Sequence, residues 1–519
     1  MPEALPVTVN IGLFVEGDRP PGDVAVHSLD TVLNRIGSLL SHTPHTVRFV
    51  LPVTYGKNEE IVQRILSCNF WKERNPPEFH FFRRKDVECI LKEPLLEDAS
   101  YEIHEIIPAI KTYGYDPVSI AITDYSSLVI IIGTESGFTG TGDKNSYALA
   151  KHYGRSVVSI DVVTGRIMEI PSTDNIFYSY AQIDSYNSKK VSPAKYFAEK
   201  ERYISILEQD LRIAGFDEDS IAFSFESFLP HYIKVKGLAR RYHFLYALKG
   251  VMIALLSALA IFTITIQTLF FPENTSLIWI EVGLIGIIII FMVAAKIGDY
   301  HIKSIDYSFL AERIRTAFYT RIVCISCLTT DSLPLMIPVR TPNDWMVMVF
   351  ETIVSSGRGM ACKKEMPLEP IRKFIISGWI RKRLNYYVKE AEKARFRYNV
   401  LANFAVLLFI VTLILAIGHA LGIGHRETMF HFEVSLIIAC FTITIPAFGA
   451  AVSAIRVQRE YHRNSERHSQ IIQHLTAVIT EMEYAEDVGE LCTLIQKMNE
   501  ITFREENEWK LVSKCIDTE

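Results

Sequence analysis

The sequence predicts an α/β Rossmann-like amino-terminal domain with a parallel sheet, followed by an all-α region of four transmembrane helices with cytosolic helices. Two observations predict this order: strand-like and helix-like segments alternate early in the chain, and four long apolar segments occupy its second half. The 519 residues are also too many for one compact domain, which takes roughly 150 residues.

The early part of the chain alternates between strands and helices. Residues 7–15 form an apolar, β-branched run that ends at a turn, and residues 46–53 form a second run. Residues 31–40 and 57–66 have the apolar spacing of helices. Residues 128–132 contain no polar side chain, which is typical of a central parallel strand buried on both faces. This order indicates a parallel sheet covered by helices.

A glycine-rich loop follows the strand at 128–132 and precedes a helix. Glycines let the backbone approach a ligand, and free amides at a helix start favour phosphate. The spacing is neither that of a Walker loop nor a strict GxGxxG fingerprint, so a tight structural turn remains the alternative to a nucleotide site. The candidate ligand-binding residues of this loop are Gly133, Thr134, Gly140, Thr141, Gly142 and Asp143.

Four segments nearly free of charged residues are long enough to cross a membrane. The first has 22 residues, about 33 Å as a helix, against a hydrocarbon core of about 30 Å. Lys and Arg gather before and after each pair of spans, so the positive-inside rule predicts a multi-pass protein of the cell (inner) membrane with both termini cytosolic. The predicted spans are 251–272, 277–295, 398–421 and 434–455.

Charge and cysteine content exclude several classes of protein. A net charge of −5 without a long basic segment argues against a nucleic-acid binder. No Asp, Glu, Lys or Arg lies near the middle of a predicted span, which argues against pumps and secondary transporters. Cys324 and Cys327 are closely spaced but lack a second ligand pair, so we predict neither a metal site nor a cofactor. The amino terminus lacks a signal-peptide pattern, and we expect it to be uncleaved and cytosolic.

Milder polarity marks the first predicted span. Ser257, Thr265 and Thr268 fall on one face of a helix. They are candidates to line a water-filled path in an assembly of several chains. The alternative is that they hydrogen-bond neighbouring helices.

The two pairs of spans look like two copies of one unit. Arg-Tyr-x-x-Leu occurs at 241–245 and 397–401, before each pair. After each pair, a Tyr-x-x-x-Ala/Ser-Glu-Arg motif begins at Tyr307 and at Tyr461. The pattern predicts an internal duplication, with shared hydropathy as the alternative explanation.

The front of the chain carries an early Gly-x-Arg-Pro turn, a Leu-Pro pair with a nearby Tyr, and a strand that enters a Gly-x-Gly loop before a helix. The residues are Gly17, Arg19 and Pro20; Leu51, Pro52 and Tyr55; and Gly133, Gly140, Gly142 and Asp143. With these residues, the segment from 6 to about 170 resembles the SLOG family of Rossmann-like domains, which are related to the LOG enzymes and to DprA. The resemblance implies a nucleotide-derived ligand. The chain lacks the Pro-Gly-Gly-x-Gly-Thr-x-x-Glu signature of the phosphoribohydrolases, so we expect binding rather than hydrolysis.

The membrane half is similar to the SLATT family, predicted two-span effectors associated with SLOG sensors in bacterial defence systems. The Tyr-x-x-x-Ala-Glu-x-x-Arg motif from Tyr307 to Arg315 carries this resemblance, and Ser469 stands where the second copy would place the arginine. The expected organisation is a SLOG-like domain at 1–190, a helical linker at 191–249, a first hairpin with its helix at 250–320, a connector at 321–397, a divergent second hairpin at 398–455 and cytosolic helices at 456–519.

The leading hypothesis is a nucleotide-sensing membrane effector of bacterial antiphage defence, in which an oligomer opens a pore or disrupts the bilayer. Gly17 and Arg19 would join the glycine-rich loop at the ligand, and Arg19 could pair with phosphate unless it is simply an exposed turn charge. A membrane-tethered nucleotide hydrolase is the second hypothesis, with Glu16, Asp18 and Asp143 as its carboxylates. A non-conducting membrane scaffold is the third.

Overall fold

In the computed structural model, the chain forms two compact units. The first unit contains Met1–Phe197, Ser224–Lys234 and Ile337–Ala361, and the second contains Ala198–Phe223, Val235–Met336 and Cys362–Glu519. The structure describes residues 7–16, 21–40, 47–53, 58–67, 77–84, 100–106, 115–134, 145–169, 173–214, 222–324, 345–355, 367–425, 427–429 and 432–499.

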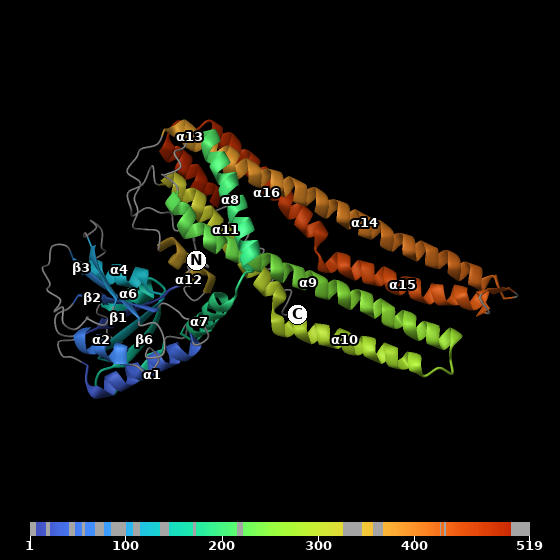
Figure 1. Cartoon of the computed structure of the whole chain (residues 1–519), viewed down its shortest axis with the longest axis horizontal. Helices are drawn as coiled ribbons and strands as arrows, with labels where there is room; N and C mark the ends of the chain where they lie inside the picture. Colours follow the sequence, from blue (N-terminus) through green and yellow to red (C-terminus); the bar gives the residue numbers. More distant parts are fainter. Residues whose placement is uncertain are drawn as a thin grey trace. The chain divides into compact units, whose positions relative to one another are not determined.

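The first unit is built on a sheet of seven described strands in the order β4-β3-β2-β1-β5-β6-β7 (Figure 1). All neighbouring strands are parallel except β6 and β7, which are antiparallel. The strands are β1 Val9–Val15, β2 Val47–Pro52, β3 Glu78–Arg84, β4 Tyr101–Ile106, β5 Leu128–Gly133, β6 Ser156–Asp161 and β7 Ile167–Glu169.

The centre of the sheet is apolar on both faces. Every residue of β5 is buried, and so is every residue of β6. Strand β1 pairs with β5 from Ile11↔Leu128 to Val15↔Ile132. Burial on both faces explains why the sequence of β5 shows no polar alternation, and it confirms the prediction of a central parallel strand.

Helices cover both faces of this sheet, with α4 and α6 on one side and α1 and α7 on the other (Figure 1). Asp116 caps α4 by accepting a hydrogen bond from the Ser119 amide at 2.9 Å. The predicted α/β Rossmann-like class is therefore confirmed. The helices of the first unit are α1 Asp23–Leu39, α2 Asn58–Ser67, α4 Pro117–Tyr125, α6 Ser146–His152, α7 Thr173–Ser188 and α12 Trp345–Ser355.

Helix α12 comes from a distant part of the sequence, within the segment that we expected to be a connector, yet it packs into the first unit. The ring of Trp345 lies 6.1 Å from that of Tyr186 on α7. The buried guanidinium of Arg155 pairs with Glu351 at 3.2 Å. The sheet unit is consequently completed by residues more than 100 positions beyond the predicted domain end at residue 190.

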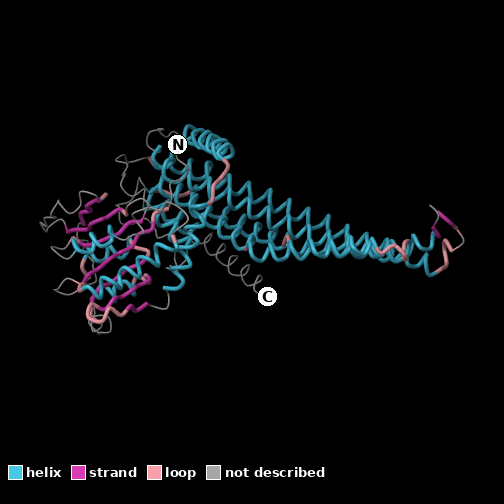
Figure 2. The backbone as a smooth tube through the Cα atoms, turned by 60° about the horizontal axis from the view of Figure 1, so that its bottom comes forward, coloured by secondary structure: helices cyan, strands magenta, loops and turns pink. Residues whose placement is uncertain are grey.

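The second unit is helical, with a small two-stranded hairpin of β8 Thr428–Met429 and β9 Phe432–Glu433. Figure 2 shows its long helices running alongside one another. The unit contains most of α8 and α9 and all of the others. Its helices are α8 Pro193–Ala214, α9 Ala222–Phe270, α10 Ser276–Gly298, α11 Tyr300–Cys324, α13 Leu368–Lys373, the π-helix η3 Phe374–Ile380, α14 Arg381–Ala420, α15 Val434–Gln458 and α16 Tyr461–Glu483.

Four described helical segments are long and apolar enough to cross a membrane. The predicted spans match α9, α10, α14 and α15, one in each, except that the first extends two residues past the end of α9 and the third extends one residue past the end of α14. Their apolar side chains face outward: Trp279 is 74% exposed and Ile290 is 65% exposed. Exposed apolar surface of this extent is expected of helices that contact lipid or other chains. These features are consistent with a membrane protein.

The two hairpins pack against each other. The rings of Phe270 and Phe432 meet edge to face at 4.8 Å near the hairpin ends. A Cβ added to Gly449 would lie 3.3 Å from the ring of Phe409, so this glycine lets α15 approach α14 closely. Gly449 therefore serves the packing of α15 against α14 within the second hairpin.

A left-handed residue separates each second span from the next helix. Asp299 (φ 46°) precedes α11, and Glu460 (φ 47°) precedes α16. The helix that begins at Tyr461 thus corresponds by position to the one that begins at Tyr300, whereas the sequence comparison paired Tyr461 with Tyr307. Both copies share an acidic-Tyr-His start, which supports a duplication in a shifted alignment.

Candidate functional site

The strand order reverses between β1 and β5. The strands that follow β1 add to one side of the sheet, and the strands that follow β5 add to the other side. Ligands of open parallel sheets bind outside the carboxyl ends of strands at such a point. Glu16, Gly133 and Thr134 lie there, with the Glu16 amide donating to the Ile132 carbonyl at 2.8 Å. The geometry therefore places two of the predicted ligand residues at the expected edge. The others, Gly17, Arg19, Gly140, Thr141, Gly142 and Asp143, lie outside the described residues.

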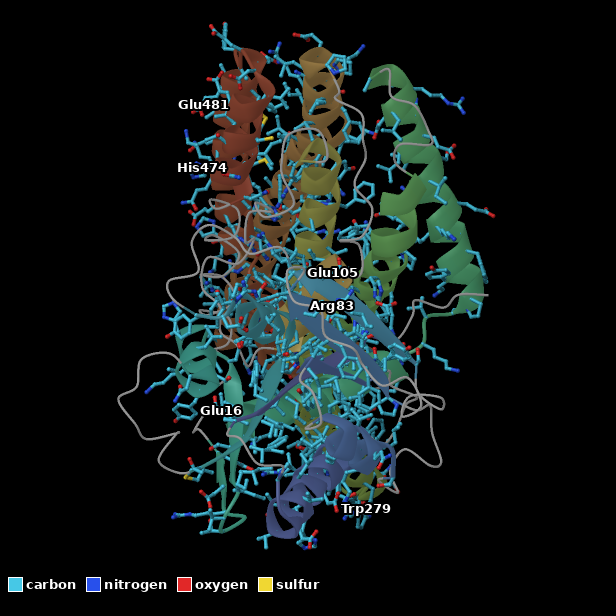
Figure 3. All side chains as sticks on the ribbon, turned by 90° about the vertical axis from the view of Figure 1, so that its left-hand side faces the viewer. Glu16, Arg83, Glu105, Trp279, His474 and Glu481 are labelled. Carbon is cyan, nitrogen blue, oxygen red and sulfur yellow. The ribbon has the colours of Figure 1, made fainter. Side chains whose placement is uncertain are left out.

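The start of helix α6 faces the same edge. Its Ser146 amide donates to the Glu16 carboxylate at 2.9 Å, and its Ala148 amide donates to the side chain of Asn145 at 2.7 Å. Glu16, labelled in Figure 3, was a candidate catalytic carboxylate, but here it occupies a helix amide that would otherwise suit a phosphate. An anion at this position would have to displace the carboxylate or bind beside it.

A second carboxylate at this edge is committed to a turn. Asp161 ends β6 and is buried. It accepts hydrogen bonds from the amides of Val163 and Thr164 at 3.0 and 2.6 Å and from the Thr164 hydroxyl at 2.8 Å. Three donors fix its position, so Asp161 holds the turn into β7 and is poorly suited to act as a general acid or base.

A different polar cluster lies at the other end of the sheet, on strands β3 and β4. His80 pairs in register with Glu102, and Phe82 pairs with His104, so all four side chains face the same side. His80 Nδ1 lies 2.6 Å from His104 Nε2, and Glu102 Oε2 lies 3.7 and 3.6 Å from these two nitrogens. We call His80, Glu102 and His104 the β3–β4 cluster. Its atoms are close enough to bind one metal ion.

The surroundings of the cluster hold both imidazoles neutral. Burial, the Arg48 guanidinium and His104 lower the pKa of His80 from 6.5 to about 3. Burial also lowers the pKa of His104, an effect that Glu102 opposes and Arg48 reinforces. Arg48 itself pairs with Glu78 at 2.8 Å. Neutral imidazoles are the form in which histidine binds metals.

The strands at 78–84 and 101–106 are not predicted from the sequence, and none of these residues is among the predicted site residues. The available signal was Glu102-x-His104, an alternation that puts both side chains on one face of a strand. Glu102 and His104 come together with His80 only because β3 pairs with β4, and this pairing is seen only in the tertiary structure. Cys327, one of the closely spaced cysteines, lies outside the described residues.

The three candidate pore residues on α9 donate hydrogen bonds within their own helix. Ser257, Thr265 and Thr268 each bond the carbonyl four residues earlier, at 2.8, 2.7 and 2.8 Å. Thr265 is buried, Ser257 is half-buried and Thr268 is exposed. In this structure the three hydroxyls therefore bond within α9 and not to neighbouring helices, which was the alternative to lining a water-filled path.

The motif that carries the SLATT resemblance forms an ion-pair cluster. Glu312 on α11 accepts from Arg315 at 2.6 Å and pairs with Arg383 on α14 at 2.7 Å. The Arg383 side chain is only 2% exposed. The motif therefore joins the helix after the first hairpin to the helix that enters the third span.

No protein-family model matches the chain, and neither a curated protein sequence nor a solved structure matches it significantly. The resemblances to SLOG and SLATT consequently stay predictions.

Proposed function

We propose that the protein is a nucleotide-sensing membrane effector of the SLOG–SLATT type, acting at the inner membrane in bacterial antiphage defence. A nucleotide-derived signal binds the sheet unit, and oligomerised spans then open or disrupt the membrane. The observation that carries this proposal is the presence, in one chain, of a Rossmann-like sheet and four outward-facing apolar helices. Both termini are cytosolic in this proposal, because Lys and Arg flank the pairs of spans on one side.

The ligand would bind where β1 and β5 end. Support comes from Gly133, Thr134 and the start of α6, whose amides favour an anion. Glu16 now holds the Ser146 amide. A phosphate that displaces Glu16 would exchange one acceptor for another at the Ser146 amide and free the Glu16 side chain. Such a differential contact is what a ligand needs in order to shift an equilibrium between two states.

The test uses the full chain, because α12 from residues 345–355 packs into the sheet unit. Purified protein is reconstituted into dye-filled liposomes, and a panel of linear and cyclic nucleotides is added. We expect one class of nucleotide to cause leakage and Glu16→Gln to shift the concentration that it requires. The matched control is Glu169→Gln, which removes an exposed carboxylate paired with Arg35 in the same unit.

Other outcomes of this experiment would favour one of the two alternative functions. Consumption of a nucleotide without leakage would favour the membrane-tethered hydrolase. Neither leakage nor turnover, with the protein folded in the bilayer, would favour the non-conducting scaffold.

A further inference from the structure

We propose that the β3–β4 cluster binds one transition-metal ion of the Zn²⁺ class through His80 Nδ1, His104 Nε2 and a carboxylate oxygen of Glu102. This inference concerns a part of the sheet away from the switch between β1 and β5, and it does not rest on the proposed function.

The spacing of the three donor atoms suits a tetrahedral ion. Ligand atoms at the usual 2.0–2.1 Å from Zn²⁺ lie about 3.3 Å from one another at tetrahedral angles. The observed separations are 2.6 Å between the two nitrogens and 3.6 and 3.7 Å from each nitrogen to the carboxylate. Small rotations of the half-exposed His104 ring and the exposed Glu102 side chain bring all three to the required spacing.

The donor set selects the class of metal. Two imidazoles and one carboxylate suit Zn²⁺ and its transition-metal neighbours, whereas Mg²⁺ and Ca²⁺ prefer oxygen ligands. Three protein ligands leave a fourth position for water or another small ligand. The exposed side of Glu102, which is 68% exposed, provides the path by which an ion enters.

The groups around the cluster match those that support metal-bound histidines. His80 is 5% exposed, and its second nitrogen faces a Glu78 oxygen at 3.9 Å. Arg48 holds that glutamate at 2.8 Å, which places a carboxylate behind the buried ligand and balances the positive charge of the guanidinium. Phe82 and Tyr125 stack on the rings of His104 and His80 at 4.9 and 6.2 Å and form aromatic contacts beside the cluster.

Helix α4 and the opposite face of the strands flank the site. Tyr125, the last residue of α4, stacks on the ring of His80, while the carbonyl oxygens of Asp124 and Tyr125 accept hydrogen bonds from Arg155 and Asn10. The other face of β3 and β4 carries the ion pair of Arg83 and Glu105 at 2.5 Å, both labelled in Figure 3. Arg83 and Glu105 are partners in the same register that brings His80 and Glu102 together.

The test measures binding of the metal itself to the full chain in detergent after treatment with a chelator. We expect one Zn²⁺ per chain by isothermal titration and elemental analysis, and visible absorption bands of a tetrahedral site when Co²⁺ replaces it. Glu102→Gln and His104→Gln should weaken binding by more than the roughly 10–100-fold that loss of an outer partner costs. Glu78→Gln should fall within that range.

The control is His462→Gln, because His462 and Glu466 form another His–carboxylate contact, at 3.3 Å on an exposed helix face. It should leave the affinity unchanged. Both ligand variants alter half-exposed or exposed side chains, and a melting curve without metal verifies that they fold. Absence of a bound ion in the folded protein, or equal affinity in wild type and His104→Gln, overturns the proposal and leaves a hydrogen-bonded pair of neutral histidines.

Discussion

The Glu16 carboxylate accepts a hydrogen bond from the Ser146 amide at 2.9 Å and thereby joins the end of β1 to the start of α6. These residues are 130 positions apart in the chain. A carboxylate at a helix amino terminus satisfies a free amide and complements the helix dipole. The same place in a Rossmann-like sheet commonly holds a phosphate, so the contact is both a stabilising cap and a competitor for an anionic ligand.

Removal of this cap should destabilise the sheet unit. We expect Glu16→Ala to lower the free energy of unfolding by about 1 kcal/mol, the usual effect of losing a helix cap. Denaturant unfolding of the purified protein measures it. Glu169→Ala should cost less, because its ion pair with Arg35 is solvent-exposed. Equal effects of the two substitutions would contradict a capping role for Glu16.

The buried ion pair of Glu312 and Arg383 should contribute more to stability than the exposed ion pair of Arg381 and Glu483. Arg383→Met removes a positive charge that offsets the buried negative charge of Glu312. We expect this substitution to lower the free energy of unfolding by about 3 kcal/mol. Arg381→Met, two residues away, removes an exposed contact to Glu483 at 3.3 Å and should change stability by less than about 1 kcal/mol. Chemical unfolding in detergent compares the two variants, and similar losses would argue against the cluster as a joint between α11 and α14.

Helix α12 should contribute directly to the stability of the sheet unit. Trp345 is 8% exposed, so Trp345→Ala should cost about 3 kcal/mol through lost burial. Faster hydrogen exchange of the β5 and β6 amides would report this loss of stability. The matched control is Trp279→Ala. Trp279 lies on α10, is 74% exposed and is labelled in Figure 3, so its loss should leave the exchange of those amides unchanged. Unchanged exchange in Trp345→Ala would show that the sheet does not depend on α12.

Stability should fall with acid because of His80. Its pKa is lowered from 6.5 to about 3, so below pH 6.5 the unfolded chain binds a proton that the folded chain does not. Between pH 6.5 and 5, metal-free protein should lose about 2 kcal/mol through this group. The loss continues until the pH approaches 3.

Denaturant unfolding with a chelator present, for wild type and His80→Phe, isolates this contribution from the other histidines. The variant should lose less stability than wild type over the same pH interval. Parallel pH dependences of the two proteins would mean that His80 is not the group responsible.

Local patterns were enough to predict the α/β sheet and the four apolar helices. The uninterrupted apolar run of β5 and the lengths of the four apolar helices depend on composition over short stretches, and burial of both strand faces follows from the first of these. The same reasoning placed Gly133 and Thr134 at the end of a buried strand, whereas the reversal of strand order there is seen only in the structure. It also found the motif that contains Glu312, although not its partner Arg383.

The sequence by itself thus determined the fold class and the positions of the four long apolar helices. Only the tertiary structure decided that α12 belongs to the sheet unit, that Glu16 caps α6, and that His80, Glu102 and His104 meet. The physical reason is range: periodicity and hydropathy report the surroundings of neighbouring residues. Contacts such as that between Glu16 and Ser146 depend on strand order and register, which no single segment encodes.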